Sequence, residues 1–192
     1  MNQDDVLKIF IETGGLLEGH FILTSGYHSP QYFQCAKVLQ YPKYNTLFAT
    51  EIAKHFSNFD ITLVISPAIG GIVLGTEVGR ILNVRTIFAE RENGIMKLRR
   101  GFTISESDNV LICEDVVTTG KSVFEIIEIV KENKANLKGV GYIIDRSNGK
   151  VNFNTEQFSL AKLDVIKFAP DEVPDWLEKI PVSKPGSRFI KN

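Results

Sequence analysis

Residues 110–130 read VLICEDVVTTGKSVFEIIEIV, and the order of the parts within this stretch indicates an α/β fold. It opens with an apolar run ending at Cys113, which predicts a buried strand over residues 109–113. A polar loop follows, and residues 121–133 carry apolar side chains at helical spacing, which predicts an amphipathic helix. The next apolar run, residues 138–145, predicts another strand. A strand, a helix and a second strand in this order indicate parallel pairing through a crossover.

The segment before this unit repeats the same order. Strands are predicted over residues 61–66 and 85–90, with a helix over residues 72–82 between them. Residues 94–104 separate the two units and predict an exposed loop or β-ribbon inserted into the alternation. The whole pattern predicts an α/β fold with a central, mostly parallel sheet flanked by helices.

Both ends of the chain lack this alternation, and we expect them to form a small hood. The elements predicted outside the two units are a helix over 4–13, two short strands about a turn within 20–34, a helix beginning at Pro42, a strand over 159–168 and a short helix over 172–180. We therefore predict one domain over residues 1–192, with a core of about 42–146 and a hood from about 1–41 and 147–192.

Composition excludes several classes of protein. The 22 Lys and Arg against 23 Asp and Glu give a net charge of −1, which predicts no nucleic-acid partner and no anionic membrane partner. No apolar stretch approaches the ~20 residues of a membrane span, and the acidic start is unlike a signal peptide. Cys35 and Cys113 fit neither a disulfide framework nor a zinc site. We expect Cys113 to be a small buried side chain and the protein to be cytoplasmic.

Four polar loops follow the predicted core strands. Ligands of open parallel sheets bind outside the carboxyl ends of the strands, so these loops are predicted to converge on one site. They read SPAIGG (66–71), AERENG (89–94), EDVVTTGKS (114–122) and IIDRS (143–147).

The loop 114–122 has the chemistry of a sugar phosphate site. One phosphate could bind here, because the loop contains Thr and Ser hydroxyls and leads into the N-terminus of a helix. Gly120 allows the backbone to come close to such a ligand. Glu114 and Asp115 suit a ribose, because carboxylates accept hydrogen bonds from its two neighbouring hydroxyls. The loop ends like a nucleotide-binding P-loop, but Asp115 stands where that motif requires its first glycine. The alternative structural interpretation is an N-capped helix after an acidic turn.

The stretch VLICEDVVTTGKS resembles the signature of the type I phosphoribosyltransferases. The blocks FILTSGYHSPQYFQCAKVL, SPAIGGIVLG, FAERENGIMKLRRGF and YIIDRS are similar, in the same order, to those of family members that act on orotate. The resemblance covers about residues 14–146. It implies the family fold and transfer of the 5-phosphoribosyl group from phosphoribosyl pyrophosphate (PRPP) to orotate. The products are orotidine 5′-monophosphate and pyrophosphate, in de novo pyrimidine (UMP) biosynthesis, with Mg²⁺ held mainly through PRPP.

The resemblance also implies roles for individual residues. PRPP is expected to bind at Glu114, Asp115, Val116, Val117, Thr118, Thr119, Gly120, Lys121 and Ser122. Orotate is expected at Thr118 and Arg146, and a guanidinium suits its carboxylate. Taken alone, Asp145-Arg146 is better interpreted as a surface ion pair at a strand end, because such pairs are common. Asp115 and Arg91 are expected to be catalytic, and no protein-held metal site is expected.

Two lysines of many relatives are absent, at the positions of Thr24 and Gly70, so positive charge for PRPP must come from elsewhere. Residues 85–101 contain five basic residues (Arg85, Arg91, Lys97, Arg99 and Arg100) against Glu90 and Glu92, a local excess of three. A basic loop that closes over pyrophosphate neutralises the leaving group. The resemblance implies a homodimer in which loop 91–101 contributes to the neighbouring site.

Three other functions are compatible with parts of the pattern. They are transfer to a purine or another base, non-catalytic binding of PRPP by a regulator, and a P-loop NTPase. The three histidines, His20, His28 and His55, show neither triad nor metal-ligand spacing, and we expect structural or surface roles for them.

Overall fold

The computed structural model describes residues 1–23, 25–163 and 166–183. Its main element is a six-stranded sheet in the order β5-β4-β3-β6-β7-β8, in which neighbouring strands are parallel except β4 and β5. The strands are β3 (Leu63–Pro67), β4 (Arg85–Glu92), β5 (Ile95–Leu98), β6 (Asn109–Val117), β7 (Asn136–Asp145) and β8 (Glu156–Lys162). The predicted α/β class with a mostly parallel central sheet is confirmed, and β4 and β5 form the predicted ribbon.

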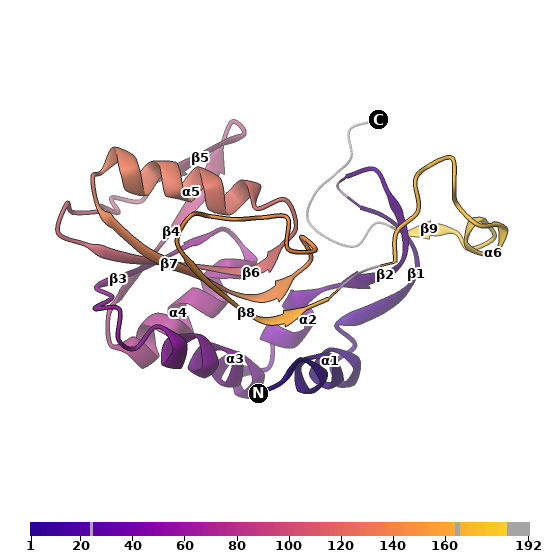
Figure 1. Cartoon of the computed structure of the whole chain (residues 1–192), viewed down its shortest axis with the longest axis horizontal. Coiled ribbons are helices and arrows are strands. Elements are labelled where there is room, and N and C mark those ends of the chain that lie inside the picture. The colour runs from indigo at the N-terminus through magenta and orange to yellow at the C-terminus, as the bar shows by residue number, and fades with distance from the viewer. Residues whose placement is uncertain (24, 164–165, 184–192) are drawn as a thin grey trace.

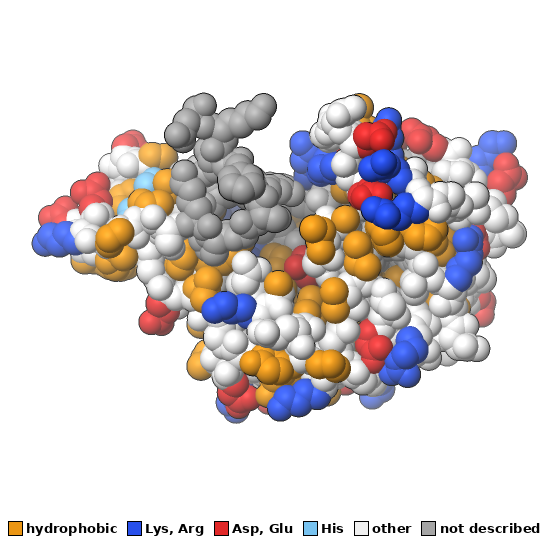
Figure 2. Space-filling view, turned by 180° about the vertical axis from the view of Figure 1, so that it is seen from behind, with side chains coloured by type: hydrophobic (Ala, Val, Ile, Leu, Met, Phe, Trp, Pro, Cys, Tyr) orange, Lys and Arg blue, Asp and Glu red, His pale blue; other side chains and the backbone are white. Residues whose placement is uncertain are grey.

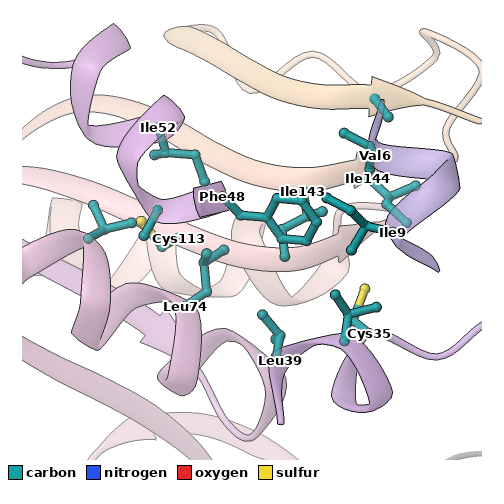
Figure 3. Packing of buried hydrophobic residues seen from close by; sticks show 14 of the residues in the cluster. Val6, Ile9, Cys35, Leu39, Phe48, Ile52, Leu74, Cys113, Ile143 and Ile144 are labelled. Carbon is teal, nitrogen blue, oxygen red and sulfur yellow. The ribbon is translucent and has the colours of Figure 1, made fainter. Parts of the chain in front are cut away.

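Helices cover both faces of this sheet (Figure 1). α3 (Pro42–His55) and α4 (Gly70–Leu82) lie on one face, and α5 (Lys121–Glu132) lies on the other. Each face has its own cluster of buried apolar side chains. Figure 3 shows the first cluster, where Phe48 of α3 packs against Ile143 of β7. Cys113 is fully buried within this cluster, as expected for a small apolar side chain.

Glycines bring α4 unusually close to the sheet. A Cβ atom on Gly75 would lie 2.1 Å from Ser66 Oγ, and one on Gly79 would lie 2.0 Å from Thr86 Cγ2. These residues are four apart and therefore share one helix face, which packs directly onto β3 and β4. The close approach holds the first turn of α4 beside the carboxyl end of β3.

Segments from both ends of the chain form the hood (Figure 1). Its three-stranded sheet has the order β2-β1-β9, and β1 and β2 are the predicted antiparallel hairpin. The hood strands are β1 (Leu16–Ile22), β2 (His28–Phe33) and β9 (Val182–Ser183), and the accompanying helices are α1 (Gln3–Glu12), α2 (Cys35–Leu39) and α6 (Asp175–Glu178). Residues 184–192 of the predicted hood lie outside the described residues.

The predicted end of the core at about residue 146 is wrong, because β8 belongs to the central sheet. Asp145 of β7 pairs in parallel register with Lys162 of β8. β8 begins earlier than the predicted strand over 159–168 and ends at Lys162, so residues 166–168 of that prediction lie outside it. β8 joins the sheet through backbone hydrogen bonds to β7. A pattern of apolar side chains does not show which strand has backbone groups available for another strand. The expectation of a single domain stays a prediction.

Two smaller differences concern helices. α2 was not predicted, because a helix of five residues is too short for a periodic pattern. The helix predicted over 172–180 is only α6, which begins after Pro174. Within the described parts of the chain, no helix is both long and apolar enough to cross a membrane.

Candidate active site

The carboxyl ends of β3, β6 and β7 lie along one edge of the sheet, and their arrowheads point towards the hood (Figure 1). The backbone N–H of Arg146 donates to the carbonyl of Val117 at 2.8 Å, so the loops after β6 and β7 start side by side. Cys35 of α2 lies at the same place, with its Sγ 4.0 Å from the carbonyl oxygen of Asp115. The predicted convergence of loops after β3, β6 and β7 is therefore present, and α2 contributes to it.

Glu114 and Asp115 lie within β6 and not in the loop after it, because pairing with β7 continues to Val117. Glu114 is buried, and Asp115 is half-buried. The backbone N–H of Asp115 donates to Glu114 Oε1 at 3.0 Å, and that of Val116 donates to Asp115 Oδ1 at 2.8 Å. The rigid strand therefore fixes both carboxylates more firmly than a loop would.

Both carboxylates approach the first turn of α4. A Cβ atom on Gly70 would lie 2.2 Å from Asp115 Oδ2, and one on Gly71 would lie 3.2 Å from Glu114 Oε1. The first turn of α4 has no acidic residue, and its N-cap residue Ile69 makes no side-chain hydrogen bond. The positive end of a helix attracts acidic side chains, so the N-terminus of α4 is a favourable neighbour for these two residues. Gly70 is one of the two positions at which the sequence resemblance implied a lysine, and here the Asp115 carboxylate occupies the space of a side chain.

The loop after β6 ends in the first turn of α5, whose N-cap residue has no side chain. Gly120 is the N-cap residue of α5 and has a left-handed φ of 71°. A side chain is excluded there, since a Cβ atom would lie 2.9 Å from both Phe153 and Val151. Thr118 and Thr119 are exposed, and the α5 first turn contains no acidic residue. The Thr119 hydroxyl accepts a hydrogen bond from the Lys121 backbone N–H at 3.4 Å, so one amide of the first turn is capped by a threonine, as in the alternative interpretation. Exposed hydroxyls and helix N-terminal amides are also groups that can bind an anion.

Arg146 presents a buried donor to this site. Its Nε is buried and has no hydrogen-bond partner among the described residues. Burial lowers the pKa of the guanidinium, and nearby Tyr32 and Cys35 act in the opposite direction. Tyr32 belongs to β2 and Cys35 to α2, so the guanidinium lies between hood and sheet. A desolvated arginine with an unused donor suits an anionic ligand.

The alternative of an Asp145-Arg146 surface ion pair is wrong. Asp145 is buried, and its Oδ1 accepts hydrogen bonds from the backbone N–H and the hydroxyl of Ser147, at 2.8 and 2.6 Å. These bonds fix the start of the loop that carries Arg146. Asp145 is therefore a structural neighbour of the site.

Cys35 is a site residue that the sequence pattern did not single out. Burial raises the pKa of its thiol well above the usual value, and Asp115 and Glu114 raise it further, whereas Arg146 lowers it. Cys35 is therefore a neutral thiol between the acids and Arg146. The only available signal was its place in the block FILTSGYHSPQYFQCAKVL.

Arg91 lies on the β4–β5 ribbon and makes its hydrogen bonds away from Asp115. Its Nη1 donates to Glu125 Oε1 and to the Gly94 carbonyl, both at 2.9 Å, and its Nη2 donates to Glu125 Oε2. Glu125 belongs to α5. The structure therefore brings Asp115, the loop that begins at Thr118 and Arg146 together but holds Arg91 against the side of α5.

The other ribbon cations are also paired. Figure 2 shows Lys and Arg side chains interleaved with Asp and Glu on the upper part of the sheet region. The pairs are Lys97–Glu92 at 3.0 Å, Arg99–Glu92 at 3.3 Å, Arg100–Glu90 at 2.9 Å and Arg85–Asp108 at 2.5 Å. The predicted excess of three positive charges omitted Asp108 and Glu125, which reduce it to one.

The histidines have structural contacts, as predicted. His20 is buried, with Nδ1 3.0 Å from the Ile180 carbonyl and Nε2 2.6 Å from His28 Nδ1. His55 Nε2 lies 2.8 Å from Oε1 of Glu156, the first residue of β8. Thr24, the other position at which a family lysine is missing, lies outside the described residues.

Comparisons with known proteins identify the family of the chain. No family model matches the sequence. The chain is 56% identical over 188 residues to the orotate phosphoribosyltransferase of Chlorobaculum parvum, which covers 98% of this chain and 97% of the relative. It is 53% identical over 188 residues to the orotate phosphoribosyltransferase of Thermoanaerobacter sp., with 98% and 99% covered.

Solved structures show the fold independently. Orotate phosphoribosyltransferase from Aeropyrum pernix has a TM-score of 0.71 at 20% identity, covering 82% of this chain and 93% of that one. Adenine phosphoribosyltransferase from Thermoanaerobacter pseudethanolicus has a TM-score of 0.61 at 14% identity, covering 69% and 88%. The fold is thus that of the type I phosphoribosyltransferases, as the sequence resemblance implied.

Proposed function

The chain belongs to the orotate phosphoribosyltransferase family, and we propose that the edge formed by β3, β6 and β7 is where it performs that family's reaction. The reaction transfers the 5-phosphoribosyl group from PRPP to orotate and yields orotidine 5′-monophosphate and pyrophosphate, in pyrimidine biosynthesis. The observation that carries the assignment is the buried, unpartnered Nε of Arg146. The backbone N–H of this residue donates to the carbonyl of Val117, which in the chain separates the two carboxylates of β6 from the N-terminus of α5.

PRPP is proposed to lie along residues 114–122. The 5-phosphate takes the N-terminus of α5, where Thr118, Thr119 and Ser122 add hydroxyls to the backbone amides of the loop that includes Val116, Val117, Gly120 and Lys121. Glu114 and Asp115 accept the ribose hydroxyls from their fixed positions on β6.

Orotate is proposed to lie between Thr118 and Arg146. Its carboxylate provides the acceptor that Arg146 Nε lacks in the free protein. Because orotate is already anionic, attack on C1′ needs no strong general base. Cleavage at C1′ builds positive charge on the ribose, and the nearby carboxylates stabilise that charge. Positioning and electrostatics therefore account for the rate enhancement.

Mg²⁺ is proposed to bind mainly through PRPP. The carboxylate oxygens of Glu114 and Asp115 are of the ligand type that Mg²⁺ prefers, so the donor set fits this ion. When bound, the ion supplies positive charge to the pyrophosphate leaving group.

Arg91 is proposed to contact pyrophosphate after leaving Glu125, in a homodimer where loop 91–101 contributes to the neighbouring site. The exposed position of the ribbon and the pairing of Arg91 to a second element support a movable contact. A cytoplasmic location is also proposed, and the two free, buried cysteines fit a reducing compartment.

A direct assay tests the function. The purified chain is mixed with orotate, PRPP and Mg²⁺, and the absorbance of orotate is followed. Loss of orotate that requires PRPP is expected, with no turnover when adenine or hypoxanthine replaces it. PRPP binding without turnover of any base would instead identify a regulator, and turnover of a purine would reassign the base.

A further inference from the structure

One ion pair connects the β4–β5 ribbon to the helix that follows the phosphate loop. Arg91 of the ribbon and Glu125 of α5 form a two-pronged pair, in which each terminal nitrogen donates to a different carboxylate oxygen. The side chains retain only 30% and 26% of their exposure, so the pair is screened less than a surface pair. The Gly94 carbonyl accepts a further hydrogen bond from Arg91 Nη1 at 2.9 Å.

This arrangement occupies the end of the guanidinium formed by its two terminal nitrogens, and it leaves Nε–H and one Nη2–H for a second acceptor. Of the five N–H donors of an arginine, three are used here, and both terminal nitrogens point at Glu125. A phosphate group is bound through a parallel pair of N–H donors of this kind, and it also competes for the positive charge that Glu125 now neutralises. Glu125 and a pyrophosphate group therefore compete for Arg91.

Glu125 also differs from the other acids that neutralise the ribbon. Glu90 and Glu92 pair with Arg100 and Lys97 inside the ribbon, so those pairs move with it. Glu125 belongs to a separate element, one turn after the phosphate loop. The Arg91–Glu125 pair must therefore break whenever the ribbon moves away from α5.

We propose that Glu125 is a latch residue. It holds Arg91 in the substrate-free protein and lowers the affinity for the pyrophosphate group of PRPP, because that group must displace it. Glu125 is a positioning residue that acts through Arg91, and the proposal rests on the proposed contact between Arg91 and pyrophosphate. It predicts a gain of affinity when the latch is removed, which damage to the fold does not produce.

The test compares Glu125→Ala with Glu128→Ala. Glu128 is on the same helix, pairs with Lys131 at 2.8 Å and is 65% exposed, so its removal changes the net charge equally without touching the ribbon. We expect Glu125→Ala to lower the KM for PRPP, and for pyrophosphate in the reverse reaction, by about threefold to tenfold, with kcat changed less than about twofold. Glu128→Ala is expected to match the wild type.

Arg91→Gln separates the latch from a general charge effect. In that background the difference between Glu125→Ala and the parent is expected to vanish, because nothing remains to be released. A raised KM in Glu125→Ala, or the same KM in Glu125→Ala and Glu128→Ala, would overturn the latch.

Limited trypsin digestion provides a readout that needs no activity. Cleavage after Lys97, Arg99 or Arg100 in the substrate-free protein is expected to be faster in Glu125→Ala than in Glu128→Ala. Equal cleavage rates would overturn the latch even if the chain is fully active. Faster cleavage in a chain that fails to use orotate would support the latch while refuting the proposed function.

Discussion

Replacement of Arg146 by alanine should separate orotate binding from PRPP binding. Arg146 Nε is buried and has no partner among the described residues. Orotate binding therefore does not include the free-energy cost of removing water from this donor. Truncation of one member of a buried, hydrogen-bonded charge pair costs about 2–5 kcal/mol. Because Arg146 is half-buried, we take about 2–3 kcal/mol, which corresponds to an increase of about 30-fold to 150-fold in the KM for orotate.

The KM for PRPP should change less than about twofold, since the proposed PRPP contacts lie on residues 114–122. Thermal stability should be unchanged or slightly higher, because the substitution removes a buried donor that lacks a partner. The assay is steady-state kinetics with each substrate varied in turn, together with thermal unfolding of the free protein.

Arg85→Ala is the matched control. Arg85 donates to the Thr103 carbonyl at 2.9 Å and to Asp108, away from the site, so its loss should lower the free energy of unfolding by about 1–2 kcal/mol and leave the KM for orotate unchanged. An equal rise in both KM values for Arg146→Ala, or a loss of stability as large as that of Arg85→Ala, would show that Arg146 is structural and refute the assignment.

Three further predictions follow from the site and its surroundings. Asp115→Asn should lower kcat/KM by roughly 10-fold to 100-fold with little change in melting temperature, and unchanged kinetics would mean that the acid only caps α4. Gly70→Lys, which restores the residue of many relatives, should lower activity as Gly70→Ala does, because a Cβ atom would lie 2.2 Å from Asp115 Oδ2; a gain in activity would contradict this. Hydrogen bonds from Arg80 and Thr46 lower the pKa of Glu77 from 4.5 to about 2, so its stabilising effect is present above the unfolded pKa and is lost as the pH falls from about 5 to 2. Urea unfolding should therefore show Glu77→Gln less stable than the wild type at pH 7, with the difference shrinking at pH 3.

Local patterns were sufficient for the elements that carry strong periodic or capping signals. α3 begins at Pro42 as predicted, and α5 follows the amphipathic pattern closely. α1 starts at a capping box between Asn2 and Asp5, one residue before the predicted start. Prediction failed where pairing with an adjacent strand decides where a strand ends or which sheet it joins. β6 continues through its two acids, and β8 joins the sheet although its side chains are only partly buried.

The candidate site shows the same division. The loop 114–122 and Arg146 could be predicted because their chemistry is contiguous in sequence. The roles of Cys35 beside Asp115, of Gly70 beneath Asp115 and of Glu125 against Arg91 depend on contacts between distant residues. No spacing rule encodes these contacts, since each is created by the packing of one element on another.

The ribbon illustrates what a count of charges along the chain leaves out. Counted locally, it has an excess of three positive charges, but Asp108 and Glu125 reduce that excess to one once the chain is folded. A cation that is already paired contributes to ligand binding only the difference in free energy between its pair with the ligand and its pair within the protein. Among the described residues, Arg146 Nε has no such partner, and in the first turn of α5 only the Lys121 N–H has a side-chain acceptor, Thr119. The affinity of the free chain for its substrates should therefore come mainly from these two features, and the ribbon should contribute only after Arg91 has left Glu125.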